Sequence, residues 1–128
     1  MEHRVIALFE IKNAKVFLAD TTRENLPARL NEYYLIVGDA VVSAGGEIHK
    51  YVFDEILASF RDSGAYENAE TKAKRAFKDI SKNGACHLVC VSAAGPVQIA
   101  EVGHPSFQVK EIFGEPVNEV YSNIQKIE

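Results

Sequence analysis

Two acidic residues stand where strands are expected to end. Glu10 follows the apolar run 5–9, and Asp54 sits at the bend between the strand-like segments Glu47–Val52 and Glu55–Phe60. If the first strand lies beside this hairpin, both carboxylates converge at one edge of a sheet. Such a pair could hold Mg²⁺ against phosphates, because Mg²⁺ prefers a few hard oxygen ligands together with substrate oxygens. The alternative is that each carboxylate is simply solvated, as acidic residues at turns commonly are.

The elements that would position these carboxylates follow from the spacing of apolar residues. The run 5–9 is continuously apolar, which is typical of a central strand. Segment 25–44 has an apolar residue at every third or fourth position, which predicts a helix. Gly45 and Gly46 follow it and predict where it stops. The next two runs then form the hairpin that contains Asp54.

The second half of the chain repeats this alternation. Segment 66–82 predicts a helix, and segments 87–91 and 97–102 predict two strands joined by a small-residue turn at 93–96. A last helix is expected from Pro116, with apolar residues at helical spacing after it. The predicted order is β-α-β-β-α-β-β-α. It favours one α+β domain over residues 1–128, a ferredoxin-like, helix-backed and mainly antiparallel sheet.

Composition and net charge limit the kinds of partner that this chain is expected to bind. The chain has 128 residues, 47% of them hydrophobic and 25% charged, which is ordinary globular usage. Its formal charge is −4 with both signs mixed along the chain, so neither nucleic acid nor a membrane surface is an expected partner. Cys86 and Cys90 would lie about 13 Å apart on one strand, too far for a disulfide. A reducing, cytoplasmic location is expected.

Two ordered blocks resemble the catalytic domain of class III adenylate and guanylate cyclases. The first consists of LNEYY at 30–34 and GGEIHKYVFDEILASF at 45–60. The second runs from GPV at 95–97 through VGHP at 102–105 to IFGEPVN at 112–118. They come in the family's order and at its spacing over nearly the whole chain. The hairpin also resembles that of diguanylate cyclases, but Ile48 and His49 stand where those enzymes have an acidic-aromatic pair.

The resemblance implies a role for five residues. Glu10 and Asp54 fall on the two metal-binding positions, with Glu10 replacing the family's Asp. Lys50 and Glu111 fall on the positions that read the purine base. Asn118 falls on the catalytic Asn that orients the ribose and phosphate. The implied cofactor is Mg²⁺ or Mn²⁺, and the implied substrate is a purine nucleoside triphosphate.

Other positions depart from the family's pattern. Ser122 stands where the family has an Arg that meets charge on the transferring phosphate. Asn13 and Ala14 replace the Gly and Phe that follow the first strand. Phe53 replaces the Gly before the second metal ligand, so it either adopts a strained positive φ or bends the hairpin differently. Losing one charge-stabilising donor typically costs about 10²–10³ in rate.

These observations predict a cyclase-like domain of cyclic-nucleotide signalling with an impaired active site. Since the family's sites form between two subunits packed head to tail, a homodimer or a pairing with another cyclase domain is expected. Two alternatives remain open. One is a slow but working adenylate or guanylate cyclase, and the other is a purely structural interaction module.

Overall fold

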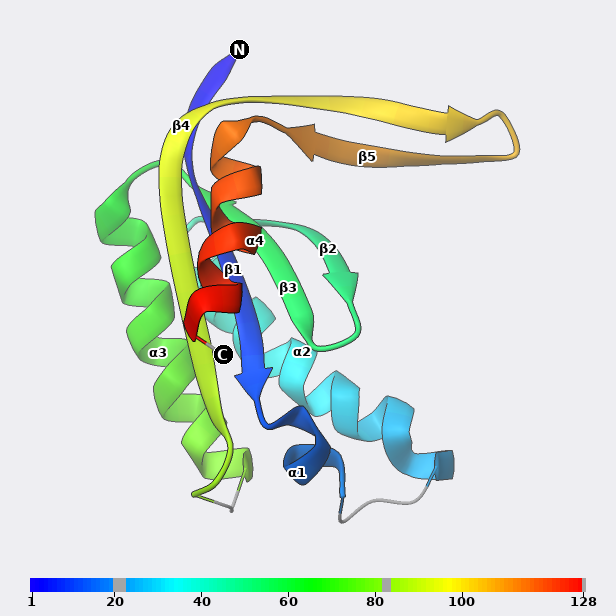
Figure 1. The fold of residues 1–128 in the computed structure, drawn as a ribbon, viewed down its shortest axis with the longest axis vertical. Coiled ribbons are helices and arrows are strands. Elements are labelled where there is room, and N and C mark those ends of the chain that lie inside the picture. The colour runs from blue at the N-terminus through cyan, green and yellow to red at the C-terminus, as the bar shows by residue number, and fades with distance from the viewer. Residues whose placement is uncertain (20–22, 82–83, 128) are drawn as a thin grey trace.

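The computed structural model describes residues 1–19, 23–81 and 84–127, which form an antiparallel sheet with helices on both faces (Figure 1). The sheet order is β2-β3-β1-β4-β5. The strands are β1 (Glu2–Lys12), β2 (Glu47–Val52), β3 (Glu55–Phe60), β4 (His87–His104) and β5 (Phe107–Phe113). The helices are α1 (Ala14–Leu18), α2 (Leu26–Ser43), α3 (Ser63–Ser81) and α4 (Glu115–Ile127), with a 3₁₀ turn η1 (Arg23–Asn25).

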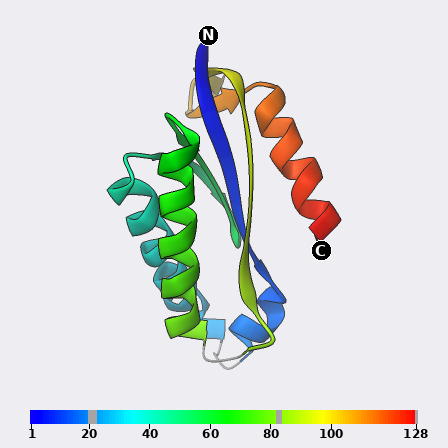
Figure 2. The same cartoon turned by 90° about the vertical axis from the view of Figure 1, so that its left-hand side faces the viewer.

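Strand β1 is the centre of the sheet and is covered on both faces. Helices α2 and α3 lie against one face, and α4 lies against the other (Figure 2). Ala7 and Phe9 pack towards α2 and α3, whereas Ile6 and Leu8 pack towards α4. Because successive side chains on a strand point to opposite faces, a strand buried on both sides must be apolar at every position. This is the physical reason for the unbroken run 5–9.

Strands β1 to β4, together with helices α2 and α3, confirm the ferredoxin-like prediction. Strand β1 pairs antiparallel with β3 on one side and with β4 on the other, and both crossover helices cover the same face. Strand β5 extends the sheet beyond β4, and α4 covers the remaining face. Among the described residues, none of the helices combines the length and apolar character needed to cross a bilayer.

Helix α2 ends where the two glycines predict. The Gly45 N–H donates to the Val42 carbonyl at 3.0 Å, and the Gly46 N–H donates to the Val41 carbonyl at 2.8 Å. Gly45 has a φ of +81°, the left-handed conformation that closes this kind of helix end. The chain therefore turns directly from α2 into β2.

The prediction of two short strands at 87–91 and 97–102 is wrong. Residues 87–104 form a single strand, in which the small residues expected to turn remain extended and pair with the start of β1. Ala94 lies opposite Val5 and Gly95 lies opposite Arg4. Long-range pairing with β1 overrides the local turn preference of this segment.

Strand β5 was not predicted at all. The outer half of β4 pairs with it, from Gln98 opposite Phe113 to His104 opposite Phe107. The turn lies at 105–106 instead, next to Gly103 with a φ of +127°. The resulting β4–β5 hairpin, which we name the arm, projects from the body of the protein (Figure 1).

Helix α3 begins three residues before the predicted start at residue 66. Asp62 accepts a hydrogen bond from the Ala65 backbone N–H through Oδ1 at 2.8 Å, which caps the first turn. The segment Asp62-Ser63-Gly64 therefore starts a helix rather than only closing the hairpin. The short helix α1 was also not predicted.

Replacing Gly46 with Ala is expected to lower the free energy of unfolding by about 1–3 kcal/mol through overpacking. A Cβ at this position would lie 2.6 Å from Phe60 Cε1 and 2.9 Å from Val41 Cγ1, both in the core. Chemical denaturation of the variant measures the loss. Gly84→Ala is the matched control, because its Cβ would meet no atom within 4 Å. Equal stability of the two variants would contradict this packing.

Candidate functional site

The bend between β2 and β3 consists of Phe53 and Asp54. Phe53 has a φ of +55°, so the strained alternative predicted for it is correct. Two tyrosines of α2 hold this conformation. The Tyr33 hydroxyl donates to the Asp54 carbonyl at 2.7 Å, and the Tyr34 hydroxyl donates to the Phe53 carbonyl. These two hydrogen bonds hold the backbone in a conformation that is unfavourable for a bulky residue such as Phe.

The bend places the Asp54 side chain against the backbone of β1, next to Glu10 in the sequence. The Asp54 Oδ2 atom accepts the Ile11 backbone N–H at 3.1 Å, immediately after Glu10 in β1. The β1–β3 pairing runs to Phe9 opposite Ile56, one residue short of Glu10. Burial raises the pKa of Tyr33 well above its usual value, and the charges of Asp54 and Glu10 add to this effect. Both carboxylates therefore disfavour ionisation of the Tyr33 hydroxyl.

The donor chemistry of this pair suits a hard divalent cation. Asp54 is half-buried, and one carboxylate oxygen of Glu10 is shielded from solvent. Within residues 1–19, 23–81 and 84–127, no three His, Cys, Asp or Glu side chains gather as a metal cluster. A cation here would have two protein carboxylates and would take its other ligands from water or substrate. That is how Mg²⁺ is usually held at phosphate sites.

The second expected pair does meet. The Lys50 Nζ atom lies 3.1 Å from Glu111 Oε1 in a half-exposed ion pair. A β-bulge between Ile48 and Lys50 shifts the register of β2, and both His49 and Lys50 line the same hollow. Bulges re-aim side chains in this way. The pair thus offers a donor and an acceptor side by side.

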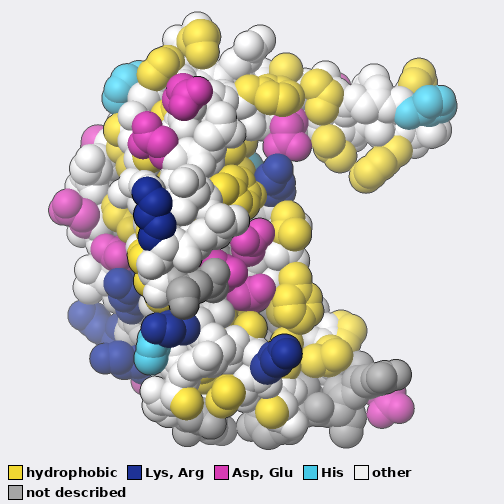
Figure 3. All heavy atoms as spheres, in the orientation of Figure 1, with side chains coloured by type: hydrophobic (Ala, Val, Ile, Leu, Met, Phe, Trp, Pro, Cys, Tyr) yellow, Lys and Arg dark blue, Asp and Glu magenta, His cyan; other side chains and the backbone are white. Residues whose placement is uncertain are grey.

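A hollow of about 460 Å³ surrounds this pair, and Val109 and Lys110 of the arm also line it. It belongs to the concave face of the protein, between the arm and the body (Figure 3). Burial raises the pKa of Tyr121 on α4, and the charges of Glu55 and Glu111 contribute. The charge of Glu111 thus pairs with Lys50 and also disfavours ionisation of Tyr121.

Asn118 and Ser122 lie on the exposed side of α4, one turn apart. The inward side of this helix carries Val117, Val120 and Ile124, which pack on the sheet. The start of α4 is closely fitted, because Gly114 has a φ of +150° and a Cβ there would lie 2.6 Å from the Pro96 carbonyl oxygen. The structure therefore fixes the helix that carries Asn118, while its catalytic role stays a prediction.

The turn after β1 departs from the family's sequence but keeps a left-handed residue. Asn13 has a φ of +63°, and its side-chain Nδ2 donates to the Ala85 carbonyl at 2.6 Å. Asn tolerates this conformation better than other non-glycine residues. Asn13 and Phe53 thus both occupy positive φ at positions where the resembled family has Gly.

The bend anchors Tyr33 and Tyr34 were not predicted as functional residues. Tyr33 is fully buried in the core. The Tyr34 ring packs on Tyr51 at a centroid distance of 4.3 Å. Their hydroxyl contacts join residues 19 to 21 positions apart, and local apolar spacing carries no signal for such contacts.

Comparison with known proteins gives a result at the level of structure. No protein-family model and no curated protein sequence matches this chain. A bacterial light-regulated adenylyl cyclase aligns with a TM-score of 0.81 and 17% identity, over 94% of this chain and 38% of that one. The chain thus spans less than half of that cyclase. The adenylyl cyclase CyaB from P. aeruginosa aligns at 0.79 with 17% identity, over 94% of this chain and 70% of that one.

A third solved structure is the guanylate cyclase domain of RhGC from Catenaria anguillulae in complex with GTP. It aligns with a TM-score of 0.80 and 16% identity, over 94% of this chain and 70% of that one. The chain has the fold of a class III nucleotide cyclase catalytic domain. At this level of identity the likeness concerns the fold, and it confirms the resemblance found in the sequence.

Replacing Phe53 with Gly is expected to make the protein more stable than Phe53→Ala by about 0.5–1 kcal/mol. Relief of the left-handed strain, about 1–2 kcal/mol, is partly offset by the greater freedom of Gly in the unfolded chain. Both variants remove the same half-exposed ring, so only the Cβ differs between them. Urea denaturation of the two variants measures this difference. A more stable Ala variant would contradict the strain.

Proposed function

We propose that this chain is a cyclase-like domain that binds a purine nucleoside triphosphate with Mg²⁺ or Mn²⁺ between two subunits, with impaired cyclisation. The observation that carries the proposal is the Asp54–Ile11 hydrogen bond, which holds Asp54 beside Glu10 at the end of β1. These are the positions that the cyclase resemblance assigns to the metal. The matching fold supports the same assignment.

Each pair of residues has a part in this proposal. Glu10 and Asp54 hold the metal, which would neutralise charge on the triphosphate. Lys50 donates to an acceptor on the edge of a purine base, and Glu111 accepts from a neighbouring donor. Asn118 orients the ribose and phosphate. Adenine and guanine both offer an adjacent donor and acceptor on this edge, so the site suits either purine.

Two subunits are part of the proposal because exposed apolar side chains occupy both walls of the concave face (Figure 3). Tyr51, Val52 and Phe53 are exposed on the β2–β3 hairpin. Val102, Phe107, Val109 and Phe113 are exposed on the arm. A second copy packed head to tail would cover both groups and would bring the metal carboxylates of one copy to the base-reading pair of the other.

The proposed impairment of cyclisation follows from the presence of Ser122. In-line displacement at phosphorus depends on positioning and on charge stabilisation rather than on covalent chemistry with the protein. A serine hydroxyl supplies no positive charge where the family has an Arg. The left-handed Phe53 adds a bulky ring beside the metal ligand Asp54, where the family keeps Gly. Binding is therefore retained better than turnover.

Restoring the Arg tests this interpretation. With Mn²⁺ and either ATP or GTP, wild-type turnover is expected near background, and Ser122→Arg should raise it by about 10²–10³. Cyclic-nucleotide formation is the measurement. Asp54→Asn in the Ser122→Arg background is the control and should abolish the gain, since it weakens the metal site.

The other outcomes choose between the alternatives. Wild-type turnover that is lost in Asp54→Asn would identify a slow working cyclase. Absence of ATP or GTP binding with Mn²⁺ in both wild type and Ser122→Arg would contradict the proposal and favour a purely structural module.

Dimer formation is tested on the arm. Phe107, which is 74% exposed at the arm's tip, is expected to be buried in the dimer, so Phe107→Glu should weaken self-association by at least tenfold because it would bury a charge. Sedimentation over a range of concentrations measures this effect. Leu35→Glu is the matched control, because Leu35 is 64% exposed on α2, which is part of neither the arm nor the β2–β3 hairpin. A wild type that stays monomeric at high concentration, without a cyclase partner in pull-downs, would contradict this part.

A further inference from the structure

Lys50 and Glu111 belong to strands that lie at opposite edges of the sheet. Strand β2 is one edge and β5 is the other, so no backbone ladder among the described strands joins them. The sheet curls until these edges approach, and ion pairs bridge the gap. A twisted sheet allows this approach but does not define the final distance. Side chains must therefore set the separation of Lys50 and Glu111.

Glu47 on β2 makes the other ion pair between the two edges, with Lys110, and it also contacts residues of the body. Its carboxylate lies 3.4 Å from Arg4 Nη1, 3.6 Å from His49 Nδ1 and 3.8 Å from Lys110 Nζ. Arg4 comes from β1, His49 from β2 and Lys110 from β5. One carboxylate thus ties the arm to both the edge and the centre of the sheet.

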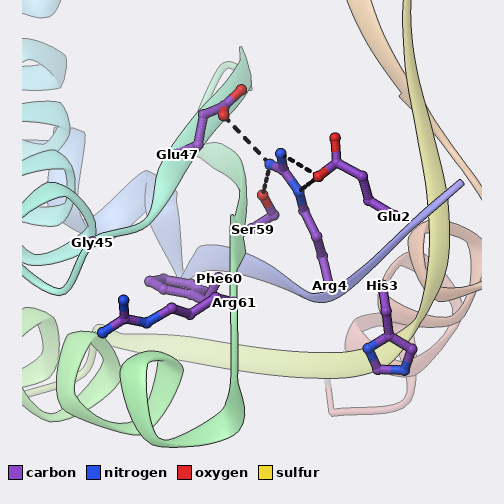
Figure 4. Close-up of a pocket in the computed structure, with 8 residues that line it drawn as sticks. All are labelled: Glu2, His3, Arg4, Gly45, Glu47, Ser59, Phe60 and Arg61. Atoms are coloured by element: carbon purple, nitrogen blue, oxygen red, sulfur yellow. Dashed lines mark hydrogen bonds and ion pairs between the residues drawn. The ribbon is translucent and has the colours of Figure 1, made fainter.

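The side of this cluster within the body of the protein is rigid. Ser59 on β3 is 1% exposed, and its Oγ accepts a hydrogen bond from Arg4 Nη1 at 2.9 Å. The same Oγ forms a hydrogen bond of 2.7 Å with His49 Nε2. Figure 4 shows Arg4 held by Glu2, Ser59 and Glu47, beside a pocket of about 260 Å³. Satisfied buried networks of this kind hold their members in one arrangement.

The protonation state of His49 determines which groups balance the negative charge of Glu47. Burial lowers the pKa of His49, while the charges of Glu47 and Glu111 oppose this effect and those of Arg4 and Lys110 support it. The ring is therefore neutral at pH 7. Arg4 on the body and Lys110 on the arm are the cations that face Glu47, and the arm is drawn to the body through it.

We propose that Glu47 is a positioning residue for the purine-reading pair, because it holds Lys110 and so places Glu111 of the arm beside Lys50. This inference rests on the proposed nucleotide site and assigns that site a residue outside the cyclase resemblance. Lys110 and Glu111 are adjacent on β5 and opposite in charge, and they pair with Glu47 and Lys50, which lie three positions apart on β2 across the bulge. The two ion pairs, Glu47–Lys110 and Lys50–Glu111, act as a pair of clamps between the sheet edges.

The first test needs no nucleotide. Glu47→Gln and Lys110→Met are each expected to speed amide hydrogen exchange in β5 by about two- to fivefold, the range for a partly exposed ion pair. The double variant should show no further increase, because both changes break the same contact. Controls are Glu67→Gln and Lys78→Met on α3, which should leave β5 unchanged. Unaltered exchange in Glu47→Gln and Lys110→Met would overturn the proposal.

The second test measures the base-reading function. Binding of ATP, GTP, CTP and UTP with Mn²⁺ is compared in wild type and in the same variants. A preference for purines over pyrimidines should shrink by about two- to fivefold in Glu47→Gln and Lys110→Met. Glu47→Asp, which keeps the charge, should restore part of it. A residue that only stabilised the fold would lower all four affinities alike, and that result would overturn the positioning role.

The two tests separate this inference from the function on which it rests. If wild type binds none of the four nucleotides, the proposed function fails and the base-positioning role fails with it. The exchange measurement then still shows whether Glu47 clamps the arm. If wild type binds purines but β5 exchange is insensitive to Glu47 and Lys110, the proposed function stands and only this inference fails.

Discussion

Burial of β1 on both faces is the constraint on which the rest of the structure depends. Ile6, Leu8 and Phe9 are fully buried, and each stabilises the fold by about 1.5–3 kcal/mol relative to an exposed side chain. A strand covered on two faces needs two neighbours and two layers of helices. Strands β3 and β4 supply its ladders, α2 and α3 cover one face, and α4 covers the other.

This arrangement also explains where the polar chemistry lies. On β1 the apolar run 5–9 is followed by Glu10, and Asp54, just before β3, accepts a hydrogen bond from the backbone of the next residue, Ile11. The other polar group forms where the sheet curls and its two edges approach. Among the described strands no backbone hydrogen-bond ladder joins these two edges. Ion pairs therefore set the distances between the side chains of β2 and β5. The residues proposed to hold the metal thus lie at a strand end, and those proposed to read the base lie where two sheet edges approach.

The substitutions away from the cyclase pattern are not all equivalent. Asn13 and Phe53 adopt the left-handed backbone conformation that Gly favours at these positions in the resembled family. A hydrogen bond from the Asn13 side chain stabilises the first position, and hydrogen bonds from two tyrosine hydroxyls stabilise the bend at the second. Ser122 has no such compensation, since a backbone shape can be held by neighbours but a missing charge cannot. Asn13 and Phe53 therefore both adopt positive φ, whereas Ser122 carries no charge where the resembled family has an Arg.

Much of the fold could be predicted because its signals are local. Continuous apolar residues identify β1, helical spacing identifies α2, and Gly45-Gly46 marks its end, since each depends on neighbours in the chain. The residue types at Glu10, Asp54, Lys50, Glu111 and Asn118 were also visible, whereas at Phe53 the sequence left open a positive φ or a differently bent hairpin.

Tertiary structure decided the rest, because it depends on partners far away in sequence. Small residues at 93–96 look like a turn, yet pairing with β1 keeps them extended, and the arm could not be predicted without that continuation. The meeting of Lys50 with Glu111, 61 residues apart, comes from the curl of the sheet and from Glu47. The sequence by itself determined which chemical groups are present and which elements carry them. Only packing of the sheet decided which groups meet, because the distances between strands are set by the whole core and not by any one segment.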